Sequence, residues 1–156
     1  MDIEIKIKRI EKDFAWDFIL PDYATTGSAG MDLRACIKEP VVIESNSIKS
    51  IPTGIAIHIA DKSVGGFVFP RSGLAAKHGI SLINSVGVID SDYTGEIICP
   101  IINHSSKDYI VNPGDRIAQI VFMPIYTAHF VMADVLEDTM RGPGGFGSTG
   151  KYIAAQ

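Results

Sequence analysis

The stretch Ile3-Glu4-Ile5-Lys6-Ile7-Lys8 decides the fold class, because its apolar and charged residues alternate strictly. A period of two places the isoleucines on one face of a β-strand and the charges on the other. Outward from this strand, the chain repeats short runs rich in β-branched and aromatic residues. These runs are residues 41–43, 55–59, 66–69, 95–102, 109–111, 117–123 and 128–131. Many short strands predict an all-β barrel or sandwich.

Turn residues separate the expected strands and leave room for one short helix. Pro52-Thr53-Gly54, Asn103-His104-Ser105-Ser106 and Asn112-Pro113-Gly114-Asp115 carry the proline, glycine and asparagine typical of turns. Residues 74–78 are expected to form a helical turn, with Ser72 as its N-cap and Gly79 as its stop. One such turn is too short for an α/β protein.

The composition favours one domain spanning residues 1–156. The chain has 46% hydrophobic and 21% charged residues, which suits a core that needs no disulfides. The net charge of -4 disfavours general nucleic-acid binding. Cys36 and Cys99 lack the spacing of a disulfide framework or zinc site and are expected in the core. No segment has the apolar run of a signal peptide or membrane span, so we expect a soluble cytoplasmic protein without membrane partners.

Residues 141–156 differ from the rest of the chain. The stretch Arg141-Gly142-Pro143-Gly144-Gly145-Phe146-Gly147-Ser148-Thr149-Gly150 has little apolar surface to bury. Composition alone favours a disordered tail, although the arginine, the aromatic ring and the two hydroxyls could make it a mobile arm that closes over a phosphorylated ligand. The arm is not a P-loop, because Tyr152 stands where a serine or threonine would bind magnesium and no helix can follow.

Two further segments could carry chemistry, although each has an ordinary structural explanation. Pro70-Arg71-Ser72-Gly73-Leu74-Ala75 combines a guanidinium, a hydroxyl and a glycine at the start of the helical turn. It is equally compatible with a phosphate cradle and with a capped turn. Gly87-Val88-Ile89-Asp90-Ser91-Asp92-Tyr93-Thr94-Gly95 could place a general base, but aspartate-rich turns are usually only turns.

Taken in order, five motifs resemble those of the trimeric dUTPases. The second, third and fifth motifs are the three glycine-containing stretches quoted above, at residues 70–75, 87–95 and 141–150. The first is Ala29-Gly30-Met31-Asp32-Leu33-Arg34-Ala35, and the fourth is Gly114-Asp115-Arg116-Ile117-Ala118-Gln119. The resemblance runs from about residue 21 to the C-terminus. It implies a β jelly roll, or distorted barrel, and a homotrimer whose arm closes over a neighbour's active site.

The resemblance also implies the reaction. The family hydrolyses dUTP to dUMP and pyrophosphate, which limits uracil incorporation into DNA and supplies dUMP for thymidylate synthesis. By this resemblance Asp90 holds the 3'-hydroxyl and activates the water that attacks the α-phosphorus, and Gln119 acts nearby. Mg²⁺ is the implied cofactor, with Asp32 in its outer shell through water. The site is thus expected to rely on positioning and charge neutralisation.

The remaining implied site residues bind substrate. Arg71, Ser72 and Gly73 would hold the phosphates, while Arg141, Gly147 and Ser148 would clasp the γ end. Phe146 would stack on uracil. The backbone from Asn84 through Gly87 to Tyr93 would read the base, and Tyr93 would exclude a ribose 2'-hydroxyl.

Two alternatives remain open from the sequence. A dCTP deaminase shares the implied fold and triphosphate site, but the third and fifth motifs resemble the hydrolase more closely. A catalytically silent nucleotide-binding relative should have lost its base or its arm, whereas Asp90 and Arg141 stand at their motif positions.

Overall fold

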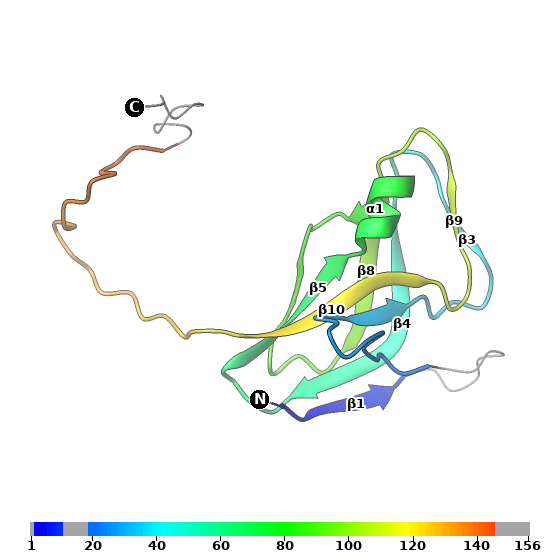
Figure 1. Ribbon diagram of the computed structural model, residues 1–156, viewed down its shortest axis with the longest axis horizontal. Coiled ribbons are helices and arrows are strands. Elements are labelled where there is room, and N and C mark those ends of the chain that lie inside the picture. The colour runs from blue at the N-terminus through cyan, green and yellow to red at the C-terminus, as the bar shows by residue number, and fades with distance from the viewer. Residues whose placement is uncertain (1, 11–18, 146–156) are drawn as a thin grey trace. The chain divides into compact units, whose positions relative to one another are not determined.

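The computed structural model describes residues 2–10 and 19–145 (Figure 1). It divides into two units, residues 1–126 and residues 127–156. The first unit holds two four-stranded antiparallel sheets and one two-stranded sheet. Its strands confirm the all-β expectation, although the described sheets stay open and do not close into a barrel.

The strand orders explain which segments become neighbours. One sheet has the order β1-β4-β8-β6, with β1 at Ile5–Arg9, β4 at Ile48–Ile59, β8 at Glu96–Asn103 and β6 at Ile80–Leu82. The other has the order β2-β10-β5-β7, with β2 at Met31–Arg34, β10 at Arg116–Pro124, β5 at Val64–Pro70 and β7 at Gly87–Ile89. The small sheet pairs β3, Val41–Ile43, with β9, Tyr109–Val111.

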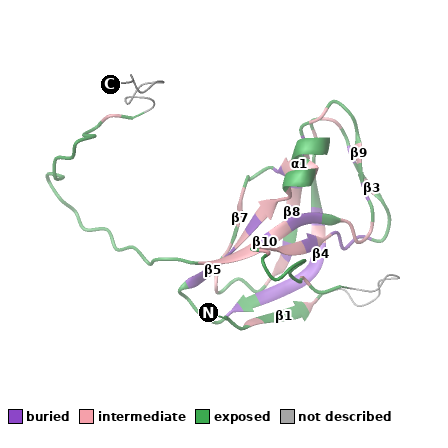
Figure 2. Ribbon diagram, in the orientation of Figure 1, coloured by how far each residue is buried: buried purple, intermediate pink, exposed green. Residues whose placement is uncertain are grey.

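The hydrophobic core joins the two larger sheets. A single buried cluster takes Ile51 and Ile57 from β4, Ile101 from β8, Val68 from β5 and Ile120 from β10. Figure 2 shows how burial concentrates along β4, whose residues from 53 to 57 are all buried. Apolar side chains on the facing sides of two sheets are the usual core of a sandwich. This core holds both sheets rigidly enough to fix the residues at their ends.

Both cysteines are buried, as the sequence predicted, and no disulfide joins them. Burial raises the pKa of the Cys99 thiol to about 12, so it remains protonated in the folded chain. No helix in the described part of the chain has the length and apolar character needed to cross a membrane.

The helix is longer than predicted at its start. α1 spans Ser72–His78, and Arg71 occupies the N-cap position without a side-chain cap hydrogen bond. The prediction of Ser72 as N-cap is therefore wrong by one residue. Gly79 ends the helix with φ 68°, and its N–H donates to the Ala75 carbonyl, which confirms the predicted stop.

Three other local predictions differ from the structure. Pro52-Thr53-Gly54 is not a turn but an irregularity inside β4, where the register with β8 shifts and Gly54 adopts φ 71°. The strand predicted at residues 128–131 is absent: residues 127–131 are described, exposed and in no strand. The short strands β2, β6 and β7 were not predicted, although residues of β2 and β7 belong to the motifs.

Candidate active site

Three of the five motifs line one cavity of about 460 Å³ in the first unit. The first motif supplies Asp32 from β2, the second supplies Arg71 and the start of α1, and the fourth supplies Gln119 from β10. The strand register explains why these three motifs lie together, because Gln119 pairs with Asp32 on one side of β10 and with Phe69 on the other. Ser72 and Gly73 lie on the same wall and are exposed.

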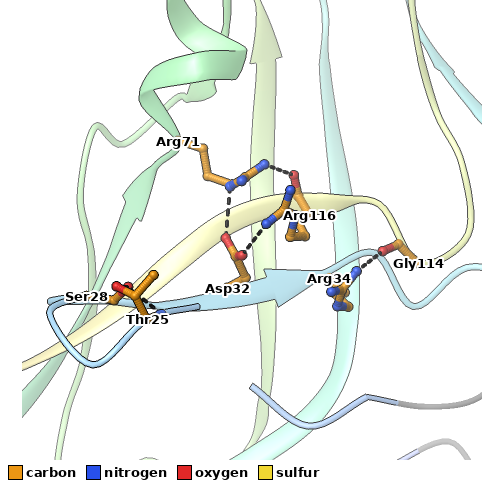
Figure 3. A network of polar contacts seen from close by, with 7 residues as sticks. All are labelled: Thr25, Ser28, Asp32, Arg34, Arg71, Gly114 and Arg116. Atoms are coloured by element: carbon orange, nitrogen blue, oxygen red, sulfur yellow. Dashed lines mark hydrogen bonds and ion pairs between the residues drawn. The ribbon is translucent and has the colours of Figure 1, made fainter. Parts of the chain in front are cut away.

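Three charged residues contact one another in this cavity (Figure 3). Arg71 Nε lies 2.9 Å from Asp32 Oδ1, and Arg116 Nη1 lies 3.0 Å from Asp32 Oδ2. Arg71 Nη1 also donates to the Arg116 backbone carbonyl at 3.2 Å. Each oxygen of Asp32 thus accepts from a different guanidinium, and the three residues form a closed ring of contacts. The side chains remain 21% to 46% exposed, so a polyanion can reach the guanidinium groups.

Gln119 lies within β10, and its side chain is held by a hydrogen bond. Its Nε2 donates to the Pro70 carbonyl at 3.1 Å, directly before Arg71. A Cβ added at Gly30 would lie 3.0 Å from Gln119 Oε1 and 3.2 Å from Val121 Cγ2. Gly30 therefore leaves the space that the Gln119 side chain occupies.

The donor set of this cavity suits magnesium only through water. Of the side chains that line the cavity, Asp32 alone is a carboxylate, and no group of three or more histidine, cysteine or acidic residues gathers among the described residues. Both Asp32 oxygens already accept from arginine, yet each carboxylate oxygen can accept a second hydrogen bond. Asp32 therefore fits the outer-shell position expected from the sequence, because magnesium commonly retains waters and takes phosphate oxygens.

The third motif lines a different and smaller cavity, of about 190 Å³. Asp90 and Tyr93 both face it, and the Tyr93 N–H donates to the Asp90 carbonyl at 3.1 Å in a turn. Tyr93 Oη donates to the Glu96 carbonyl at 2.8 Å. A Cβ added at Gly95 would lie 2.6 Å from Tyr93 Oη and 2.7 Å from Cζ, so only glycine lets the ring rest here.

Glu96 anchors this loop to the neighbouring strand. Its Oε1 accepts from the Gly54 N–H at 2.8 Å, at the irregularity of β4. The sequence alone predicted no role for Gly95 or Glu96. Their contacts with Tyr93 show that both residues support its ring. Asn84 lies exposed in the preceding turn, where its carbonyl accepts from the Val86 N–H at 2.7 Å. Gly87 follows in β7, opposite Val68 of β5.

The two cavities lie toward opposite ends of β5. Ile89 pairs with Gly66 near the start of that strand, so Asp90 lies beside Gly65. Arg71 follows Pro70 at the other end. About six residues of extended chain separate the two positions, and at roughly 3.3 Å per residue this is about 20 Å. One chain therefore does not bring Asp90 to the cavity of Arg71 and Gln119.

The fifth motif belongs to the second unit. Arg141 is exposed, and its Nε donates to the Gly144 carbonyl at 2.9 Å within a turn. Phe146, Gly147 and Ser148 lie outside the described residues.

Arg71 also affects a tyrosine near the cavity. Partial burial raises the pKa of Tyr109, and Asp115 raises it further, whereas Arg71 lowers it. Tyr109 stacks obliquely on His78 at the end of α1, with ring centroids 5.3 Å apart. This contact ties the small sheet to the helix that begins at the cavity.

Comparisons with known proteins agree with the motif order. The model of the dUTPase family matches residues 17–150. A deoxyuridine 5'-triphosphate nucleotidohydrolase of Desulfitobacterium hafniense (strain DSM 10664 / DCB-2) is 53% identical over 148 residues, covering 95% of this chain and 97% of the relative. The enzyme of the same name from Coxiella burnetii (strain RSA 331 / Henzerling II) is 48% identical over 151 residues, covering 97% and 99%.

Solved structures confirm the jelly-roll fold. The Staphylococcus bacteriophage 80alpha dUTPase with dUPNHPP has a TM-score of 0.82 at 25% identity, covering 94% of this chain and 98% of the other. A mutant dUTPase of phage phi11 of S. aureus, whose structure describes the coordination of a structural Mg(II) ion, has a TM-score of 0.75 at 22% identity, covering 86% and 99%.

Proposed function

The chain belongs to the dUTPase family, and from this premise we propose that it hydrolyses dUTP to dUMP and pyrophosphate. The observation that carries the proposal is the cavity that gathers Asp32, Arg71 and Gln119 from three motifs. Its two guanidinium groups and one carboxylate leave an excess of positive charge, which suits a triphosphate. The reaction would limit uracil incorporation into DNA and supply dUMP for thymidylate synthesis.

The active site would be shared among the chains of a homotrimer. The separation of about 20 Å along β5 between Asp90 and Arg71 supports this arrangement, because reacting groups must approach to about 3 Å. A second copy would bring its Asp90 to the cavity of the first. The arm, residues 141–156, would reach the same site from a third copy. Each chain would therefore need only a single domain with a flexible arm to complete the shared site.

Asp90 would be the general base. It is exposed in the smaller cavity beside Tyr93, where a substrate sugar and a water can reach its carboxylate. The carboxylate would hold the 3'-hydroxyl and accept a proton from the water that attacks the α-phosphorus. Gln119, held by its hydrogen bond to the Pro70 carbonyl, would orient that water and the α-phosphate. The P–O bond to the β-phosphate then breaks, and pyrophosphate leaves.

Arg71, Ser72 and Gly73 would bind the phosphates. The Arg71 guanidinium is already oriented by Asp32 and by the Arg116 carbonyl, so little freedom is lost on binding. Gly73 has open space where a side chain would stand, which lets a phosphate approach the backbone.

The arm would close the site over the substrate. Arg141, Gly147 and Ser148 would bind the γ-phosphate, and Phe146 would stack on the uracil. A closed arm would exclude water other than the nucleophile.

Magnesium would be the cofactor. When bound, the ion neutralises phosphate charge and supports departure of the pyrophosphate. Asp32 would hold one of its waters, since both of its oxygens keep a free acceptor position.

Selectivity for base and sugar would come from the third motif. The backbone from Asn84 through Gly87 to Tyr93 would read uracil, because cytosine offers a donor where uracil offers an acceptor and would leave buried groups unpaired. Tyr93 would pack under the deoxyribose, held by its hydrogen bond to the Glu96 carbonyl and by contact with Gly95. Its position would leave no space for a 2'-hydroxyl.

Pyrophosphate release in the presence of magnesium tests the proposal, with dUTP, dCTP, dTTP and UTP compared at equal concentration. We expect release from dUTP and much less from the others. Ammonia release from dCTP would identify the deaminase instead, and binding of dUTP without release would identify a silent relative. The family match favours neither alternative. A cytoplasmic location without nucleic-acid or membrane partners remains our expectation.

A further inference from the structure

We propose that Arg116 is a positioning residue that keeps Asp32 neutralised, so that Arg71 remains available to bind the substrate phosphates. The inference rests on the proposed function and adds a role that the sequence did not suggest. It starts from the position of Asp32, which lies between two guanidinium groups.

The hydrogen-bonding capacity of Arg71 is only partly used. A guanidinium carries five N–H donors. Nε binds Asp32 Oδ1 and Nη1 binds the Arg116 carbonyl, which leaves the other donors for a ligand. The same two contacts fix the plane of the guanidinium. Arg71 is thus oriented for a phosphate rather than consumed by its ion pair.

Arg116 makes this possible because it occupies the second oxygen of Asp32. Arg116 Nη1 lies 3.0 Å from Oδ2, and the side chain is 46% exposed at the cavity. Without Arg116, that oxygen would have no cationic partner in the observed network. A carboxylate readily takes two parallel bonds from one arginine. Arg71 would then turn a second nitrogen toward Asp32 and lose donors for phosphate.

The charge of the cavity adds a second loss, which does not depend on Asp32. Arg71 and Arg116 are the cations and Asp32 the anion among the described residues that line it, so one positive charge is in excess. Loss of Arg116 would leave a neutral pair facing a triphosphate of high negative charge. Attraction between the cavity and the phosphates would fall accordingly.

A double-mutant cycle with Asp32 tests the role. The variants are Arg116→Gln, Asp32→Asn and the double variant, each compared with the wild-type chain in the presence of magnesium. Calorimetry would measure binding of a non-hydrolysable α,β-imido analogue of dUTP and of dUMP. We expect Arg116→Gln to weaken binding of the analogue about 10- to 100-fold in the Asp32 background. Binding of dUMP should weaken less, because dUMP lacks the β- and γ-phosphates.

The second half of the cycle separates the positioning of Arg71 from the general effect of removing a positive charge. In the Asp32→Asn background, the same Arg116→Gln change should weaken binding at least roughly threefold less than in the Asp32 background, because the charge is still lost but no carboxylate is left to capture Arg71. Lys77→Gln is the charge control, since Lys77 is exposed on α1 and does not line the cavity. It should leave binding nearly unchanged. Equal losses in both backgrounds, or an equal loss from Lys77→Gln, would overturn the proposal.

Arg116→Lys covers the case in which the glutamine variant does not fold. Lysine keeps the charge but lacks the planar fork, so we expect an intermediate loss of affinity, with a weaker dependence on Asp32. Wild-type affinity in a folded Arg116→Lys variant would contradict a role for the guanidinium geometry. The wild-type chain separates the two claims. Failure of the wild-type chain to release pyrophosphate from dUTP would count against the proposed function. Normal release without coupling between Arg116 and Asp32 would count against the role of Arg116 alone.

Discussion

Mixing two inactive variants should restore activity if the active site is shared between chains. The variants are Asp90→Asn, which lacks the proposed base, and Arg71→Gln, which lacks a phosphate-binding guanidinium. Each is expected to be nearly inactive alone. The separation of about 20 Å along β5 means that a productive site takes Asp90 and Arg71 from different copies.

The size of the recovery follows from chance assembly. In trimers formed at random from equal amounts, a site is intact when one specified chain is the Asp90→Asn variant and its neighbour is the Arg71→Gln variant. About one quarter of the sites meet this condition in a cyclic trimer. Pyrophosphate release from the mixture should therefore reach about one quarter of the wild-type rate.

The assay needs chains that have exchanged. Two distinguishable affinity tags on co-expressed chains would allow mixed assemblies to be purified, and removal of the homotrimers should raise the recovery to about one third of the wild-type rate. A mixture of wild-type and Asp90→Asn chains, treated identically, should retain about half of the activity. If verified mixed assemblies stay at the level of the two parents while this control behaves as expected, Asp90 and Arg71 act within one chain, and the shared-site reasoning is refuted.

Three further changes test separate parts of the account. Gly95→Ala should displace the Tyr93 ring and break its hydrogen bond to the Glu96 carbonyl, which should lower dUTP-over-UTP discrimination on the order of fivefold. Gly27→Ala is the control, because Gly27 has open space around it and the change should leave discrimination unaltered. Unchanged ratios of kcat/KM in Gly95→Ala would exclude Gly95 as a support of Tyr93. Asp90→Asn should bind the imido analogue normally but lose about 100-fold or more in kcat, because an amide cannot accept the proton; turnover near wild type would remove Asp90 as base. Deletion of residues 141–156 should leave a folded trimer by light scattering with little hydrolysis, whereas a monomer would show that the arm is structural.

Local pattern predicted the strands that carry an alternation or a continuous apolar run, although Ile3 and Ile7 at β1 are exposed. The alternation at residues 3–8 led to β1, and the apolar run at residues 117–123 led to β10. Short strands such as β2 and β7 escaped prediction because few residues in them carry a periodic signal. Their pairing depends on β10 and β5, which are distant in the sequence.

Tertiary contacts also overrode two local signals. The proline and glycine at residues 52–54 were expected to form a turn, but the Glu96 carboxylate accepts the Gly54 N–H and β4 continues past the irregularity. The apolar run at residues 128–131 was expected to form a strand, yet Phe130 and Val131 are fully or almost fully exposed. A short run of this kind needs a neighbouring strand to pair with, and the described residues of the second unit contain no strand.

The motifs predicted the members of the candidate site but not their spatial grouping. The first, second and fourth motifs meet because β2 and β5 flank β10, whereas the third motif lies at the other end of β5. Arg116 belongs to the fourth motif, but the sequence predicted no partner for its side chain. Its contact with Asp32 joins residues 84 positions apart, and no local pattern reports a pairing of that range.

The central claim is hydrolysis of dUTP by attack of water on the α-phosphorus. The most direct measurement is hydrolysis in water labelled with oxygen-18, followed by mass spectrometry of both products. Attack at the α-phosphorus places the label in dUMP and none in the pyrophosphate released. Label in pyrophosphate would mean attack at the β-phosphorus, and absence of both products would mean that the chain does not catalyse the proposed reaction.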